Sequence, residues 1–147
     1  MTIPANFVAG PDGTELAWRS EGEGTPLVFC NGLANSTFQW GTILERLRGQ
    51  AKLITWDYPG HGDSRDARTR DAVTVDNLVE GLRRVIDAAV PGDERVVLLG
   101  YSLGCQVILE GVHHLDRVGA LVAVLGTPGR PFDWLFGPVM GKVNYAA

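Results

Sequence analysis

Short apolar runs alternate with amphipathic segments along this chain. The apolar runs are bounded by turn-forming residues and are typical of strands buried on both faces; they cover 26–30, 53–56, 96–99 and 118–125. Between them, apolar residues recur at helical spacing. This spacing predicts three helices, which begin after Ser36 or Thr37, Thr74 and Ser102 and end near Gly49, Pro91 and His114.

The first residues predict a hairpin. Two β-prone runs, 7–9 and 14–19, flank a Gly-Pro-Asp-Gly turn at 10–13. Together with the alternation, this predicts an α/β fold with a mostly parallel sheet, flanking helices and an N-terminal antiparallel hairpin. In open sheets of this kind the chemistry lies at the carboxyl ends of the strands, so the candidate site is formed by the loops 31–36, 57–64 and 100–104.

Composition narrows the class of protein. The 147 residues are 45% apolar and 20% charged, which excludes a disordered or fibrous chain. The net charge of −4 and the absence of any long basic run argue against nucleic acid as a partner. No apolar stretch approaches the roughly 20 residues of a membrane span, and we see no secretory leader. Two cysteines, Cys30 and Cys105, fit a reducing compartment, so we expect a cytoplasmic protein; the oligomeric state is not predicted.

One loop carries a catalytic pattern, Gly-x-Ser-x-Gly, at 100–104. The pattern alone is weak, but here it lies between an apolar strand and a helix. A sharp strand-to-helix turn strains the serine backbone, so the residues two before and two after it must be small. Ser102 would then project its hydroxyl beside the N–H groups of a helix N-terminus, where negative charge is favoured.

Three motifs in order resemble the α/β-hydrolase superfamily over residues 7–125. Asn31-Gly32-Leu33 is similar to the family's His-Gly-x loop, and Trp40 follows it. Residues 57–64, Asp-Tyr-Pro-Gly-His-Gly-Asp-Ser, match the family's Asp-x-x-Gly-x-Gly-x-Ser turn, and the serine motif comes third, with a similar segment at 114–118. The resemblance implies a serine hydrolase that acts on an ester or a similar acyl bond, without a cofactor or metal.

The resemblance also implies roles for individual residues. Ser102 would be the nucleophile, and the N–H groups of Leu33 and Leu103 would form the oxyanion hole. Asn31 stands where the family usually has histidine, and we expect it to hold the loop through side-chain hydrogen bonds. Candidate substrate-pocket residues are Asn31, Tyr101 and Trp134.

A base for the serine is harder to find. The family places the acid and the histidine after its seventh and eighth strands, so we expect both beyond Ala147. His113 and His114 lie at the far end of the helix that follows Ser102, about 17 Å away at 1.5 Å per residue. His61 has a structural counterpart in the family. Asp133 follows the sixth strand, where a minority of members place the acid.

Other polar groups have structural explanations. Loop 57–64 could cradle a phosphate, but its glycines permit tight turns, and Asp57 and Ser64 can bond the loop internally. Cys105 could be a reactive thiol at a helix N-terminus, yet a small buried residue is commoner there, and the same holds for Cys30.

The sequence therefore predicts two regions and one main activity. Residues 1–125 form the N-terminal part of an incomplete α/β-hydrolase core, and 126–147 begin a cap. We expect this chain alone to be inactive and to aggregate through the apolar edge at 118–125. Alternatives are a catalytically dead remnant or binding module, and an acyltransferase or thioesterase of the same fold.

Overall fold

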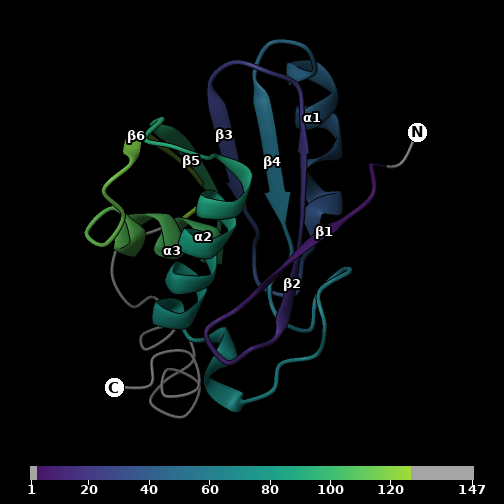
Figure 1. Cartoon of the computed structure of the whole chain (residues 1–147), viewed down its shortest axis with the longest axis vertical. Coiled ribbons are helices and arrows are strands. Elements are labelled where there is room, and N and C mark those ends of the chain that lie inside the picture. Colours follow the sequence, from purple (N-terminus) through teal and green to yellow (C-terminus); the bar gives the residue numbers. More distant parts are fainter. Residues whose placement is uncertain (1–2, 127–147) are drawn as a thin grey trace.

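The computed structural model describes residues 3–126, apart from the side chains of residues 70 and 71, and contains one six-stranded sheet (Figure 1). Its strand order is β1-β2-β4-β3-β5-β6. β1 and β2 form an antiparallel hairpin, β2 pairs antiparallel with β4, and the pairs β4–β3, β3–β5 and β5–β6 are parallel. The strands are Asn6–Ala9, Glu15–Glu21, Pro26–Cys30, Lys52–Trp56, Val96–Tyr101 and Val118–Val124. The predicted fold class is confirmed.

Helices cover both faces of this sheet. α1 (Gly41–Leu47), preceded by the 3₁₀ turn η1 (Thr37–Trp40), lies on one face, and α2 (Val75–Ala89) and α3 (Leu103–Gly111) lie on the other (Figure 1). A second 3₁₀ turn, η2 (Arg70–Val73), precedes α2. None of the helices within residues 3–126 is both long and apolar enough to cross a membrane.

The predicted helix starts are confirmed, and one predicted end is wrong. The Ser36 side chain accepts the N–H of Phe38 at η1, and that of Thr74 accepts the N–H of Asn77 at α2, so both act as N-caps. The third helix ends at Gly111 instead of continuing to His114. Beyond it, the N–H of His114 bonds three residues back to Gly111, a tighter turn than an α-helix makes.

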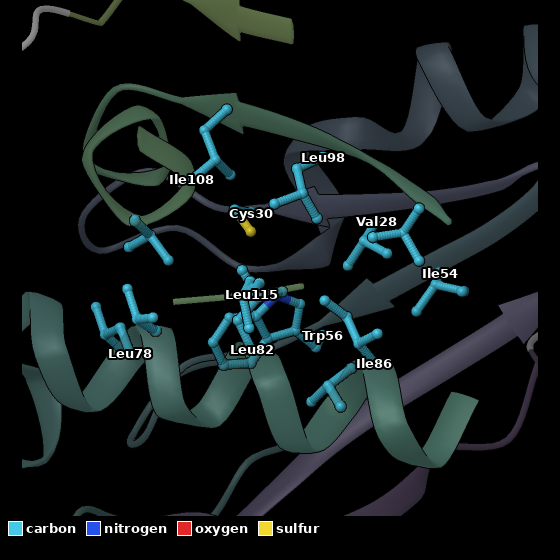
Figure 2. Close-up of a cluster of buried hydrophobic side chains, with 14 of the residues drawn as sticks. Val28, Cys30, Ile54, Trp56, Leu78, Leu82, Ile86, Leu98, Ile108 and Leu115 are labelled. Atoms are coloured by element: carbon cyan, nitrogen blue, oxygen red, sulfur yellow. The ribbon is translucent and has the colours of Figure 1, made fainter. Parts of the chain in front are cut away.

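The main core lies between α2, α3 and the sheet (Figure 2). Leu78, Leu82 and Ile86 of α2 line one stripe of that helix and face Trp56 of β4. Each such side chain, removed from water, contributes roughly 1.5–3 kcal/mol to folding. Alternate strand residues point to the opposite face, where Phe29 packs against Trp40 and Leu53. The core thus holds the central strands β4, β3 and β5 firmly, and their carboxyl ends lie side by side.

Candidate active site

Two of the three loops predicted to carry the site contact each other at the ends of β3 and β5. A Cβ on Gly32 would lie 2.9 Å from the Tyr101 ring, and a Cβ on Gly104 would overlap the Cys30 carbonyl. Both positions therefore require glycine, because the strand ends and the start of α3 approach each other without room for a side chain. The register Cys30–Gly100 between the parallel strands β3 and β5 fixes this approach.

Ser102 occupies the turn from β5 into α3 with a strained backbone. Its φ of 52° and ψ of −112° lie in a region that residues other than glycine rarely adopt. A Cβ on Gly100 would collide with the Gly104 backbone, so both glycines of the motif are needed to close the turn. The Ser102 N–H donates to the Val124 carbonyl at 3.1 Å, which ties the turn to the end of β6.

The residue after Ser102 opens α3. The first N–H groups of a helix have no partner within the helix, and they carry the positive end of its dipole. Leu103 is the first residue of α3, and its side chain is buried. Its N–H therefore lies directly after Ser102 at the N-terminal end of α3, without a partner inside the helix.

Asn31 holds the preceding loop in place. It is fully buried; its Nδ2 donates to the Trp56 carbonyl and its Oδ1 accepts from Trp40 Nε1, both at 2.8 Å. The hydroxyl of Tyr58 donates to the Asn31 carbonyl at 2.9 Å. Asn31 was a candidate pocket residue, but it exposes no surface, and both polar ends of its amide bond to protein. The expectation that it stabilises the loop fits these contacts.

The other candidate residues lie around this loop. Leu33 is 49% exposed, whereas Asn31, two residues before it, is buried. Tyr101 packs edge-on against Trp40, with ring centroids 6.5 Å apart. Trp134, like Asp133 and the start of the predicted cap, lies outside the described residues.

The loop at 57–64 is built from internal contacts, as the sequence predicts. Asp57 Oδ1 accepts from Thr37 N at 2.8 Å and Asp57 Oδ2 accepts from Asp63 N at 3.2 Å. Ser64 Oγ donates to the Asp57 carbonyl at 2.6 Å and accepts the Ala17 N–H at 2.8 Å. Asp57 also lies 3.7 Å from Arg19. Because these polar groups are paired with protein, the loop braces the site and presents no open phosphate cradle.

Among the described residues, no hydrogen bond joins a histidine to the Ser102 hydroxyl. His61 Nδ1 is 2.8 Å from the Pro59 carbonyl, and His114 Nε2 is 3.3 Å from Glu110. His113 and His114 follow the C-terminal end of α3, whereas Ser102 precedes its first residue. Within residues 3–126, the serine therefore has no bonded base.

Both cysteines are free and buried. Burial raises the pKa of the Cys30 thiol to about 12, and burial also raises the pKa of Cys105. The Cys105 sulfur lies 3.1 Å from the Gly100 carbonyl. Since a nucleophilic cysteine needs a lowered pKa, neither thiol has the setting of a catalytic one.

Sequence reasoning missed the contacts of three side chains that shape the site. Trp40 was noted as an apolar helix position and as the residue that follows the first motif, without a role in holding Asn31, and Tyr58 and Gln39 were not singled out. Tyr58 and Trp40 bond to Asn31, and Gln39 bonds to Gly32 at 3.3 Å. Only their closeness in sequence to the two motif loops could have pointed to them.

Comparison with known proteins identifies the family. Residues 27–144 match the model of the alpha/beta hydrolase family. The chain belongs to this family. The mostly parallel six-stranded sheet with its flanking helices is thus that of an α/β-hydrolase core.

Individual relatives are similar over most of this chain. It is 35% identical over 119 residues to the pimeloyl-[acyl-carrier protein] methyl ester esterase of Nitrosomonas europaea, covering 79% of this chain and 44% of that protein. It is 29% identical over 131 residues to the chloroplastic protein PHYLLO of Arabidopsis thaliana, covering 84% of this chain and 7% of that protein. A putative aryl esterase from Burkholderia cenocepacia superposes with a TM-score of 0.74 at 30% identity, covering 84% of this chain and 47% of that one. The chain thus spans less than half the length of these relatives.

Proposed function

We propose that this chain carries the nucleophile and oxyanion hole of a serine hydrolase that cleaves an ester or related acyl bond. The observation that carries the proposal is the strained Ser102 backbone at the junction of β5 and α3. Strain of this kind costs stability and persists where the surrounding structure enforces it, typically at a functional site. The relatives named as esterases support an ester as the bond cleaved.

The chemistry follows from the position of Ser102. Its Oγ attacks the acyl carbon while a base takes the hydroxyl proton, and the carbonyl oxygen becomes an oxyanion. The N–H groups of Leu33 and Leu103 donate to that oxyanion. Collapse expels the alcohol, which receives the proton from the base, and leaves an acyl-Ser102 ester. Water then attacks this ester by the same steps in reverse, and the acid product leaves.

The base and the acid that orients it come, in this proposal, from outside the described residues. His61 and His114 are engaged elsewhere, and His113 follows the far end of α3. The chain alone is therefore expected to be inactive. Tyr101 and Trp134 would line the acyl pocket, and 126–147 would begin the cap over it. Two buried free thiols favour the cytoplasm as the compartment.

A fluorophosphonate probe tests the proposal, because it reacts with an activated serine and not with an unactivated one. We expect stoichiometric labelling of Ser102 in the protein expressed from its complete gene, and none in Ser102→Ala. Residues 1–147 alone should react far more slowly. A folded complete protein that takes up no label would contradict the proposal and favour a binding module without catalysis. Substrate profiling with water and alcohol acceptors would separate a hydrolase or thioesterase from an acyltransferase.

A further inference from the structure

The two peptide groups on either side of Gly32 are fixed by different partners. In the peptide before Gly32, the Asn31 carbonyl accepts from the Tyr58 hydroxyl at 2.9 Å, and the Gly32 N–H donates to Gln39 Oε1 at 3.3 Å. In the peptide after it, the Gly32 carbonyl accepts the Asn35 N–H at 3.3 Å. The two peptides together have four polar groups, and the fourth is the N–H of Leu33. It has no acceptor among residues 3–126.

The planar trans peptide determines where this N–H points. In a trans peptide the C=O and N–H point in opposite directions. Because the Gly32 carbonyl is turned toward Asn35, the Leu33 N–H is turned the other way. Gln39 is the only side chain that holds the Gly32 N–H among the described residues, so it restrains the rotation of this segment directly before Leu33.

Gln39 makes this contact at a disadvantage for stability. Its Nε2 is buried and has no hydrogen-bond partner among the described residues. The opposite orientation of the amide would bring the NH₂ group against the Gly32 N–H, two donors together, so the oxygen must face the loop. A buried donor without a partner destabilises the folded state, and an apolar side chain of the same length would avoid that loss.

We propose that Gln39 is a positioning residue for the oxyanion hole: its carboxamide oxygen holds the Gly32 peptide so that the Leu33 N–H faces the developing oxyanion. The inference rests on the proposed hydrolase function. It adds a residue outside the motif, in η1 and two positions before α1, whose polar group serves the transition state and weakens the fold. A buried polar group that is left unpaired without a gain in stability is typical of a functional site.

The test compares Gln39→Met, which keeps the length and removes the acceptor, with Gln39→Glu, which keeps an acceptor oxygen. Gln50→Met is the matched control, because Gln50 is exposed and its amide bonds only to the Arg46 carbonyl among the described residues. Amide hydrogen exchange at Gly32 and the melting temperature are measured on the protein from the complete gene, because residues 1–147 alone are expected to self-associate. The kcat and KM for p-nitrophenyl acetate are measured on the protein from the complete gene.

In Gln39→Met we expect Gly32 exchange to rise at least tenfold, kcat to fall about tenfold and KM to stay within twofold, because an oxyanion donor acts on the transition state. The melting temperature should stay level or rise. Gln39→Glu should retain the slow exchange at Gly32, and Gln50→Met should change nothing.

Two results would overturn the inference. Unchanged Gly32 exchange in Gln39→Met would mean that the carboxamide does not hold the loop. A fall in melting temperature that accounts for the loss of kcat would mean that Gln39 is merely structural. If the complete wild-type protein shows no hydrolysis, the proposed function fails first, while exchange at Gly32 still decides whether Gln39 holds the loop.

Discussion

The hydroxyl of Tyr58 donates a hydrogen bond to the main-chain carbonyl of Asn31 at 2.9 Å. Tyr58 follows β4 and Asn31 follows β3, so this bond joins two of the loops that the sequence marks as the site. Both residues are buried, and burial raises the pKa of Tyr58 well above its usual value, so the hydroxyl remains a donor across the pH range in which the fold is stable.

Removing this hydroxyl should weaken the fold. In Tyr58→Phe the Asn31 carbonyl loses a buried donor, and we expect the free energy of unfolding to fall by about 1 kcal/mol. Urea denaturation monitored by tryptophan fluorescence measures it. Tyr101→Phe is the matched control, since the Tyr101 hydroxyl has no hydrogen bond within residues 3–126; equal losses in the two variants would contradict the assignment.

Relieving the strain at Ser102 should have the opposite effect on stability. Glycine adopts a φ of 52° readily, so we expect Ser102→Gly to raise the free energy of unfolding by roughly 1 kcal/mol while abolishing any reaction with the probe. Ser102→Ala keeps the strained backbone and should lose reactivity without that gain. If alanine stabilises as much as glycine, backbone strain is not the cause.

The decrease in the free energy of unfolding at acidic pH should depend in part on Glu80. Hydrogen bonds from Arg83, 2.7 Å away, and Arg84 lower the pKa of Glu80 to about 2. Because the pKa of Glu80 is lower in the folded state, its ionised carboxylate stabilises the fold above pH 4.5. That contribution is lost as the pH falls toward 2. Because the Glu80 side chain is 32% exposed, solvent screening limits the effect to less than about 1 kcal/mol.

The variant Glu80→Gln measures this contribution. The difference in unfolding free energy between wild type and Glu80→Gln should be constant from pH 5 to 7 and should shrink between pH 4.5 and 2. Urea melts at half-unit pH intervals provide the comparison. A difference that grows on acidification would mean that the arginines do not favour the ionised carboxylate.

The outer edge of β6 should make the isolated chain self-associate. Among the described residues β6 pairs only with β5, it carries no charge, and Val122 and Val124 are 43% and 37% exposed. An apolar strand edge is a template for further pairing. Val122→Lys should therefore reduce the aggregated fraction in light scattering, and Gln50→Lys, which adds the same charge elsewhere, should not. A monodisperse wild-type monomer that melts cooperatively would contradict this prediction.

Much of the fold could be predicted because its signals are local. The runs at 26–30, 53–56 and 96–99 are continuous and apolar, and Ser36 and Thr74 are capping residues before periodic segments. The end of α3 at Gly111 was not predicted, because the turns that follow up to His114 differ from an α-helix in N–H groups that bond three residues back, which the sequence does not reveal.

The candidate site, like the fold, could be predicted from the sequence only in part. The sequence by itself determined the family motifs, the parallel sheet and the position of Ser102 between a strand and a helix, since each depends on neighbouring residues. Only the tertiary structure decided the strand order β4-β3-β5, the burial of Asn31 between Trp40 and Trp56, and the contact of Gln39 with Gly32. These features depend on which segments pack together. A hydrogen bond between a side chain and the backbone produces no periodic pattern in the amino-acid sequence.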